Sequence, residues 1–357
     1  MKRIFVLLAL LLVTASCSKA AEPTTTSTTS LSAMSTTGTS TATTAPTTTA
    51  GTSTTTTAYA GPVSPLNGMP VDAPVERRTL AVKIDNHPAA RPQSGIQEAD
   101  AVIELPVEGV TRFMALFNAN DSTYLGPIRS VRPTDIALSK PLGGNLVVSG
   151  GSFWILRYVR AHGAHLITNT STAHNTGGMF RIDSRTAPHN LYGDTTGIRA
   201  YADDLGIPDT PPPNLFEWGP LQPDGTSNEL TLYWAPRTVW TWDGEHYTRT
   251  SDGVPHEWVA EDGTRGQIAV DTLVVILARR YTANPPKPSD GKAVPAMDVV
   301  GSGKALVFAG GEYAEGTWSR NSEDEPFTLT HPDGSALTVP PGKLWVSIYP
   351  NSLEIDR

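Results

Sequence analysis

Cysteine is nearly absent from this chain: Cys17 is the single one among 357 residues. One thiol cannot form a disulfide within the chain, so packing must stabilise the folded part. The common enzyme signatures are absent too, because the sequence has no Gly-x-Ser-x-Gly, no His-Glu-x-x-His and no phosphate-binding loop. The sequence therefore indicates no reaction class directly.

The N-terminal apolar run, residues 4–13, is too short to span a bilayer. Lys2 and Arg3 precede this run, and the small residues 14–16 separate it from Cys17. The arrangement is typical of a secretory signal peptide, residues 1–16, that ends in a lipobox. We predict that cleavage leaves Cys17 as the first residue, with a lipid such as palmitate on its sulfur. That lipid would anchor the protein to the extracytoplasmic face of the cell membrane.

Apolar residues are sparse in residues 17–60, which are rich in Thr and Ser. Such a segment buries too little apolar area to offset its conformational entropy, so we predict a disordered tether with ends about 35 Å apart on average. An excess of positive charge is missing from the whole chain, where 27 Lys and Arg face 35 Asp and Glu, a net charge of −8. The acidic balance disfavours nucleic acid as a partner, and the oligomeric state is not indicated.

The remaining chain of about 300 residues is longer than one core usually serves, which predicts two domains, at residues 61–213 and 227–357. The first alternates strand-like and helix-like patterns and is predicted to be mixed α/β. Its apolar runs predict strands at 80–84, 101–105, 112–117, 146–148 and 166–168, and helices at 133–138 and 153–161. On the second helix, Phe153, Leu156 and Val159 are spaced for one buried face.

Repeated turn signals characterise the second predicted domain. Asp-Gly or Gly-Gly turns separate apolar runs at 239–242 and 246–249, at 305–308 and 313–318, and at 327–330 and 336–339. Further strands are predicted at 273–277 and 344–348. This domain is predicted to be mainly antiparallel β, which gives an α+β fold class for the chain. Most of Trp240, Trp242, Trp258, Trp318 and Trp345 are expected in its core rather than as stacking faces for sugars.

Polar residues gather between Asp85 and Arg132, at the ends of the predicted strands. Loops at strand ends are where binding and catalytic sites are usually built. We therefore select as candidate site residues Asp85, Asn86, His87, Arg91, Gln93, Ser94, Glu104, Glu108, Arg112, Arg129, Ser130 and Arg132, with His189 and Asn190 from farther along the chain.

Several of these residues belong to ordered motifs. The motifs are residues 84–86, 90–95, 99–100, 107–109, 111–113, 126–130, 187–192 and 341–346. In this order they resemble the YerB-like bacterial lipoproteins, a family catalogued as a domain of unknown function. The resemblance covers both predicted domains and departs at Val110, where the family usually has a second glycine. It implies a membrane-anchored, two-domain envelope protein and supplies no reaction.

Three interpretations of the candidate residues stay open. In the first, Asp85, Glu104 and Glu108 pair with Arg91, Arg112, Arg129 and Arg132 and only brace the loops. In the second, Arg129 and Arg132 bind a carboxylate or phosphate, while Asn86, Gln93 and Asn190 bind sugar or peptide groups. In the third, the carboxylates act as acid and base with His87 or His189 as proton carrier. A metal held by Asp85, His87, Glu104 and His189 is conceivable from residue type alone, but we predict no metal and no cofactor.

The sequence as a whole favours a lipoprotein that binds a cell-envelope glycan or peptide. The alternatives are an envelope hydrolase that uses the carboxylates near Asp85, Glu104 and Glu108, and a scaffold for other envelope proteins. A cleft at the polar cluster would favour binding or catalysis, and paired carboxylates without a nearby arginine would favour the hydrolase.

Replacing Cys17 by Ser is expected to leave export intact and to abolish lipid attachment, because the thiol is the acceptor and a hydroxyl does not replace it. Labelling with a fatty-acid probe and membrane fractionation measure both effects, with Ser18→Ala as the matched control. Native labelling of the Cys17→Ser protein would contradict the lipoprotein prediction.

Overall fold

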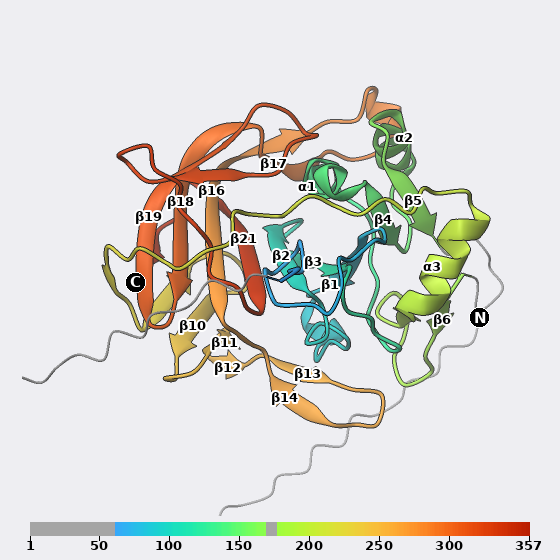
Figure 1. The fold of residues 1–357 in the computed structure, drawn as a ribbon. Coiled ribbons are helices and arrows are strands. Elements are labelled where there is room, and N and C mark those ends of the chain that lie inside the picture. The colour runs from blue at the N-terminus through green and yellow to red at the C-terminus, as the bar shows by residue number, and fades with distance from the viewer. Residues whose placement is uncertain (1–60, 169–176) are drawn as a thin grey trace, which may run out of the picture. The chain divides into compact units, whose positions relative to one another are not determined.

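The computed structural model describes residues 61–168 and 177–357. The predicted signal peptide and tether lie outside the described residues. Within them, the chain folds around a large mixed sheet of twelve strands, whose main path runs β20-β19-β18-β16-β21-β2-β3-β1-β4-β5 (Figure 1). Many more residues lie in strands than in helices, so the fold is α+β with a predominance of β-structure.

The N-terminal half contributes five strands to one side of this sheet. They are β1 (Leu80–Asp85), β2 (Ala101–Pro106), β3 (Thr111–Phe117), β4 (Asn145–Val148) and β5 (His165–Thr168). Strand β3 lies antiparallel between β2 and β1, whereas β1, β4 and β5 run parallel. These are the five strands predicted from the apolar runs of this segment.

The C-terminal half forms the other side of the same sheet. Its strands there are β8 (Gly225–Thr226), β16 (Thr272–Ala283), β17 (Val294–Asp298), β18 (Gly301–Ala309), β19 (Glu312–Arg320), β20 (Thr328–Thr330) and β21 (Leu344–Pro350). Strands β16 and β18 to β20 pair in antiparallel fashion, as predicted. The run 336–339 makes only isolated bridges instead of the predicted strand.

Strand β21 joins the two halves, because it pairs in parallel with β16 on one side and with β2 on the other. The prediction of a mainly antiparallel C-terminal region is therefore wrong at this strand. All seven residues of β21 are buried. Leu344, Val346 and Ile348 pack into one core cluster, and Trp345 and Tyr349 into another. A strand buried on both faces reads as a continuous apolar run, which does not reveal its pairing partners.

A smaller antiparallel sheet covers part of one face of the large sheet. It contains β9 (Glu229–Leu232), β10 (Thr238–Trp242), β11 (Tyr247–Ser251), β12 (Val254–Pro255), β15 (Ala269–Val270) and β22 (Ile355–Asp356). The β10–β11 hairpin is the one predicted from Asp243-Gly244. Two separate hairpins are formed by β6 (Met179–Arg181) with β7 (Leu191–Gly193), and by β13 (Glu257–Val259) with β14 (Arg265–Gln267).

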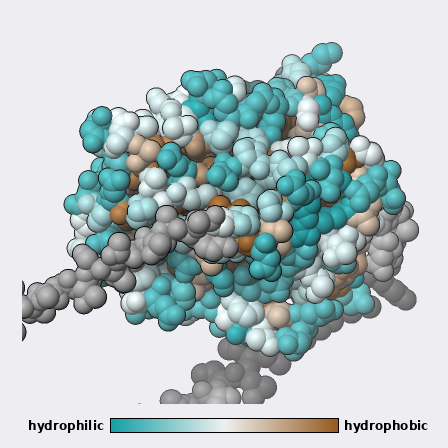
Figure 2. Space-filling model, in the orientation of Figure 1, coloured by the Kyte–Doolittle hydropathy of each residue, from teal (hydrophilic) through white to brown (hydrophobic). Residues whose placement is uncertain are grey.

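Three α-helices occur in the part of the chain that the structure describes: α1 (Thr134–Ser139), α2 (Phe153–Ala161) and α3 (Thr195–Asp204). Residues of α1 and α2 pack into one core cluster, whereas Ile198 and Ala202 of α3 pack into the other with the smaller sheet. The large sheet is thus covered on both faces. Apolar residues form only small separate patches on the face shown in Figure 2.

The predicted face of α2 is wrong at Phe153, whereas Leu156 and Val159 pack against the core. Phe153 is 71% exposed and Leu156 is only partly buried, whereas Trp154, Ile155 and Val159 are buried. The apolar residues on α2 are so numerous that their spacing allows more than one face. Helix α3 was not predicted, although Asp194 caps it by accepting hydrogen bonds from the backbone of Thr196 and Gly197.

A chain that ends at Gly342 is expected to lose its cooperative thermal transition, because removing β21 exposes the edges of β2 and β16 and opens both cores. A chain that ends at Asn351 keeps β21 and loses only the edge strand β22, so it is the matched control and should melt within a few degrees of the full chain. Circular dichroism melting compares the two. A native-like transition in the shorter chain would show that the halves do not need this strand.

Candidate functional site

Asp85 ends β1 and belongs to a group of acidic, basic and histidine side chains, which we call the surface cluster: Asp85, His87, Glu108, Arg112, Arg129, Arg132 and His189. The Asp85 side chain is 1% exposed. Its Oδ2 atom lies 2.9 Å from Arg129 Nε and 2.7 Å from His189 Nδ1. Its Oδ1 atom accepts a hydrogen bond from the backbone nitrogen of His87 at 3.1 Å. One buried carboxylate thus orients a cation and an imidazole that reach solvent.

The segment 126–132 is placed by backbone hydrogen bonds along the end of β1. The nitrogen of Asp85 donates to the Pro127 carbonyl at 2.9 Å, and the nitrogen of Arg129 donates to the Lys83 carbonyl at 2.7 Å. On its other side, the Arg129 carbonyl accepts from the nitrogen of Ser149 at 3.0 Å, just after β4. The cluster therefore lies at the carboxyl ends of parallel strands, where open sheets commonly bind ligands.

Cations outnumber carboxylates in the surface cluster, which contains three arginines and two acids. Arg112 stands opposite Asp85 in the β1–β3 register, and its Nη1 donates to the Ser130 carbonyl at 2.9 Å. Burial, followed by the charges of Arg132 and Arg129, lowers the pKa of Arg112 to about 10. This lowering reflects the cost of crowding cations in a partly dry site, a cost that a bound anion would relieve.

Arg132 is paired with Glu108, whose Oε1 and Oε2 lie 2.8 and 3.0 Å from Arg132 Nε. Burial alone would raise the pKa of Glu108, but the hydrogen bond and charge of Arg132 outweigh it and hold the pKa below its usual value. Glu108 is thus held as a carboxylate. The rings of His87 and His189 stack beside this group, with centroids 5.0 Å apart and planes inclined by 17°.

Glu104 belongs to a second group, which lies inside the protein. We call it the buried ring: Asn86, Gln93, Glu104, Thr111, Arg249 and His256. Glu104 and Arg249 are both 0% exposed, and Arg249 Nη2 lies 2.8 Å from Glu104 Oε1. Arg249 comes from β11 in the C-terminal half, and Trp345 of β21 donates its indole N–H to Glu104 Oε2 at 3.0 Å. The ion pair therefore joins the two halves of the chain.

The hydrogen bonds of the buried ring run from Arg249, which donates on both sides, to Glu104, which accepts on both sides. Arginine can only donate, so Nδ1 of His256 accepts from Arg249 and its Nε2–H donates to Gln93 Oε1 at 2.8 Å. Gln93 donates to Asn86 Oδ1 at 3.2 Å, and Asn86 donates to Thr111 Oγ1 at 2.7 Å. The Thr111 hydroxyl then donates to Glu104 Oε1 at 2.6 Å, which closes the ring.

His256 is neutral in this arrangement. Burial, then the positive charges of Arg249 and Arg91, lower the pKa of His256 well below its ordinary value. A protonated ring would also have to donate toward Arg249, which carries no acceptor. The buried ring therefore fixes both the charge and the tautomer of His256.

The structure divides the candidate residues selected from the sequence between these two groups. The surface cluster contains Asp85–Arg129 and Glu108–Arg132, two of the predicted ion pairs, and Ser130 adjoins it. The predicted pairing of Glu104 with an arginine of its own segment is wrong, because Glu104 pairs with Arg249. Asn86, Gln93 and Glu104 are buried in the ring and do not face solvent.

The other candidates have structural partners of their own. Arg91 Nε donates to Asn86 Oδ1 at 2.9 Å and its Nη1 to Ser251 Oγ at 2.8 Å, which attaches it to the buried ring. Ser94 is buried and exchanges backbone hydrogen bonds with Gly126. Asn190 accepts from Arg181 Nη1 at 2.6 Å. In residues 61–168 and 177–357, no group of three or more His, Cys, Asp or Glu is placed to hold a metal ion.

Sequence reasoning missed Arg249, His256 and the role of Trp345. All three lie in the C-terminal half, more than a hundred residues from Glu104. One signal in the sequence could have indicated a buried arginine: Arg249 occupies an inward-facing position of strand 247–251, whose residues alternate between buried and partly exposed. Its side chain is 0% exposed and lies over Phe113, Trp240 and Trp345, with distances of 5.4 to 5.7 Å from Cζ to the ring centroids.

Both halves of this architecture match one protein family. Residues 66–208 match the N-terminal domain, and residues 230–346 the C-terminal domain, of the family described as protein of unknown function (DUF3048). The chain belongs to this family, which confirms the resemblance seen in its motifs.

A named relative in bacteria is "Putative lipoprotein YerB" of Bacillus subtilis (strain 168). It is 30% identical over 302 residues, which cover 81% of this chain and 86% of that protein. The crystal structure of the YerB protein from Bacillus subtilis is similar with a TM-score of 0.69 and 27% identity, over 83% of this chain and 99% of that chain. No helix in the described part of the chain has the length and apolar character to cross a membrane.

The free energy of unfolding is expected to decrease as the pH is lowered below about 6.5, the ordinary pKa of histidine. In the unfolded chain His256 takes up a proton there, whereas in the folded chain its lowered pKa keeps it neutral. Unfolding therefore binds a proton, and its free energy should decrease by up to about 1.4 kcal/mol per pH unit from this residue.

Urea unfolding between pH 7.5 and 5 measures this slope in the native chain and in His256→Asn. Asparagine can also accept from Arg249 and donate to Gln93, but it does not titrate. The unfolding free energy of His256→Asn should depend less steeply on pH, because the variant lacks the one proton that His256 takes up on unfolding. Equal slopes in the two proteins would contradict the neutral assignment of His256.

Proposed function

We propose that this protein is an exported lipoprotein, anchored through Cys17 at the extracytoplasmic face of the membrane, that binds an anionic group of a cell-envelope glycan or peptide at the surface cluster. The observation that carries the proposal is the excess of guanidinium groups around the buried Asp85 carboxylate. The relative described as a lipoprotein supports the anchoring part of the proposal.

The local charge is opposite to that of the chain. The protein carries a net charge of −8, yet Arg112, Arg129 and Arg132 gather at one strand end against two carboxylates. Guanidinium groups present several N–H donors in one plane, a geometry that matches carboxylate and phosphate oxygens. Arg129 Nε lies 2.9 Å from Asp85 Oδ2, and the side chain is 21% exposed, so part of it reaches the surface.

Asp85 supplies the rigidity that such a site needs. Its contacts with Arg129, His189 and the backbone of His87 hold three neighbours in fixed positions before a ligand arrives. A preorganised group loses less conformational entropy on binding than a mobile surface side chain. His87 offers one further donor beside the cations, because its Nδ1 accepts from the backbone nitrogen of Ala89 at 3.2 Å and its Nε2 therefore carries the hydrogen.

The hydrolase alternative receives less support from the arrangement of the carboxylates. Glu104 is completely buried in the ring, and Asp85 and Glu108 each have an arginine at 2.8 to 2.9 Å. A general acid needs a raised pKa, whereas the pKa of Glu108 is lowered. These carboxylates are suited to orienting arginines rather than to exchanging protons with a substrate.

Replacing Arg129 by Ala is expected to weaken binding to soluble cell-wall fragments by about 10- to 100-fold, since hydrogen bonds to charged groups contribute about 1.5–3 kcal/mol. Isothermal titration calorimetry measures the affinity, and circular dichroism checks the fold. Arg279→Ala is the matched control, because Arg279 is an exposed arginine that pairs with Asp298 on β17. Unchanged affinity together with a lower melting temperature would refute the binding site and leave the cluster as a brace.

A further inference from the structure

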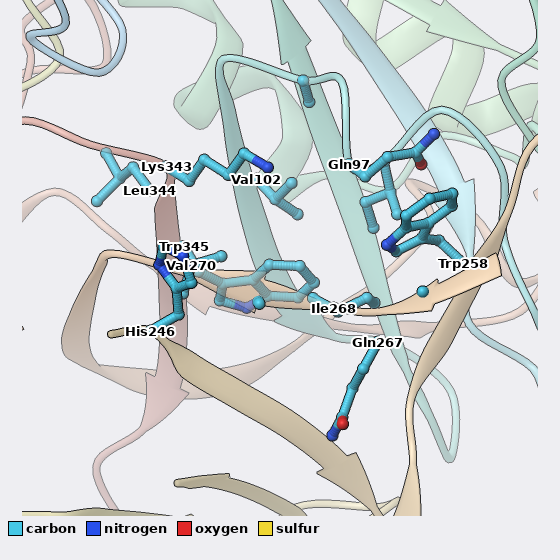
Figure 3. Close-up of a pocket in the computed structure, with 14 residues that line it drawn as sticks. Gln97, Val102, His246, Trp258, Gln267, Ile268, Val270, Lys343, Leu344 and Trp345 are labelled. Atoms are coloured by element: carbon cyan, nitrogen blue, oxygen red, sulfur yellow. The ribbon is translucent and has the colours of Figure 1, made fainter. Parts of the chain in front are cut away.

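A second site lies away from the surface cluster, where a cavity of about 250 Å³ opens between the loop before β2, the β13–β14 hairpin and the start of β21 (Figure 3). Its interior is mainly apolar, because Ile96, Val102, Ile268 and Leu344 line it together with the indoles of Trp258 and Trp345. Gln267 also lines it, but its side chain is directed away in Figure 3 and donates to the Arg249 carbonyl at 2.8 Å. Such an interior suits an apolar group.

The Trp258 ring forms a wall of this cavity and is held flat by a glycine. A Cβ atom added at Gly266, across the hairpin from Trp258, would lie 2.6 Å from Trp258 Cζ2 and 2.8 Å from its Cε2. Only glycine therefore lets the indole lie against the β14 backbone. The ring remains half-buried and presents its surface to the cavity. An aromatic wall backed by main chain is a rigid surface for an aliphatic or aromatic side chain.

Two polar groups at this cavity have no partner in the described part of the chain: the solvent-exposed ammonium of Lys343 and the buried Oε1 atom of Gln97. Lys343 is exposed, and no ion pair to its ammonium group is present in the part of the chain that the structure describes. The neighbouring carboxylate, Asp271, is already engaged, because Oδ1 lies 2.7 Å from His246 Nδ1 and Oδ2 accepts from the backbone nitrogen of Lys343 at 2.6 Å. The Gln97 Oε1 atom is buried and accepts no hydrogen bond.

These two groups also line a second cavity of about 570 Å³, which shares Gln97, Ala99 and Lys343 with the first. Its wall mixes apolar and polar residues, and the polar ones include the amides Asn67 and Asn120 and the acids Glu98, Asp100, Asp121 and Asp271. Lys343 and Gln97 thus stand at the junction of an apolar cavity and a mixed one. The junction provides one exposed cation and one buried carbonyl oxygen without a partner, which complement a carboxylate and an N–H group.

A peptide's last residue carries these groups on one carbon atom: a carboxylate, a peptide N–H and a side chain. We propose that the two cavities bind the C-terminal end of a peptide whose last side chain is apolar. The side chain enters the apolar cavity against Trp258, the carboxylate contacts Lys343, and the peptide N–H donates to Gln97 Oε1. The preceding residues lie in the second cavity, where the side-chain amides and carboxylates of its wall meet the peptide N–H groups.

The size of the apolar cavity separates this ligand from other carboxylates. A volume of about 250 Å³ is below the usual range for drug-sized ligands, so it suits one side chain rather than a long acyl chain. A sugar ring would place many hydroxyls against a wall that offers them few partners, which is unfavourable. The proposal uses no residue of the surface cluster and does not depend on the function proposed above.

The test is calorimetric titration of the full-length lipidated protein in detergent with N-acetyl-Ala-Leu and with its C-terminal amide. The acid is expected to bind about tenfold more tightly than the amide, because only the acid pairs with Lys343. In Lys343→Gln this difference should disappear. Lys287→Gln removes an exposed lysine that does not line either cavity, so it should leave the difference unchanged.

Further ligands and variants decide the remaining points. N-acetyl-Ala-Asp should not bind measurably. The Gly266→Val variant should bind N-acetyl-Ala-Leu more weakly, because the valine side chain displaces Trp258. The Arg129→Ala variant should bind N-acetyl-Ala-Leu with unchanged affinity. Equal binding of acid and amide by the native protein would overturn the proposal. Tighter binding of octanoate or of N-acetylglucosamine than of the dipeptide would also overturn it, in favour of an acyl chain or a sugar.

Discussion

The ion pair between Glu104 and Arg249 is the constraint on which the rest of this structure depends. Two charges that are completely removed from water cost several kcal/mol each, and their attraction offsets this only when the remaining polar atoms are also satisfied. Both oxygens of Glu104 accept hydrogen bonds, and three aromatic rings surround the guanidinium of Arg249. Arg249 Nε alone lacks a partner. The two halves must be in register for this pair to form.

The buried ring also sets the loop between β1 and β2, from which both proposed sites are built. Gln93 donates to the Asp85 carbonyl at 2.9 Å on one side, and its own carbonyl accepts from the nitrogen of Val259 at 2.8 Å on the other. The first contact positions the end of β1 and the surface cluster. The second positions the β13–β14 hairpin and thus Trp258. The buried ring thus connects the two solvent-facing sites through Gln93.

Local structure could be predicted where a short segment determines its own conformation. The strands of the N-terminal half and the β10–β11 hairpin follow from apolar runs and turn residues that lie together in the chain. The pairs Asp85–Arg129 and Glu108–Arg132 could be anticipated because their members lie within one segment. The partner of Glu104 could not be anticipated. Any arginine of the chain could neutralise this carboxylate, and only the fold brings Arg249 close to it.

The sequence by itself determined the predicted export and lipid signal, the family, most strands, and the concentration of polar residues after β1, because each rests on residues that are neighbours in the chain. Only the tertiary structure decided that β21 joins the halves, that Glu104 is a buried brace instead of a solvent-facing acid, and that Trp258, Gln97 and Lys343 line adjoining cavities. These features depend on pairing between segments far apart in sequence. Burial on both faces of a strand leaves no periodicity from which such pairing can be predicted.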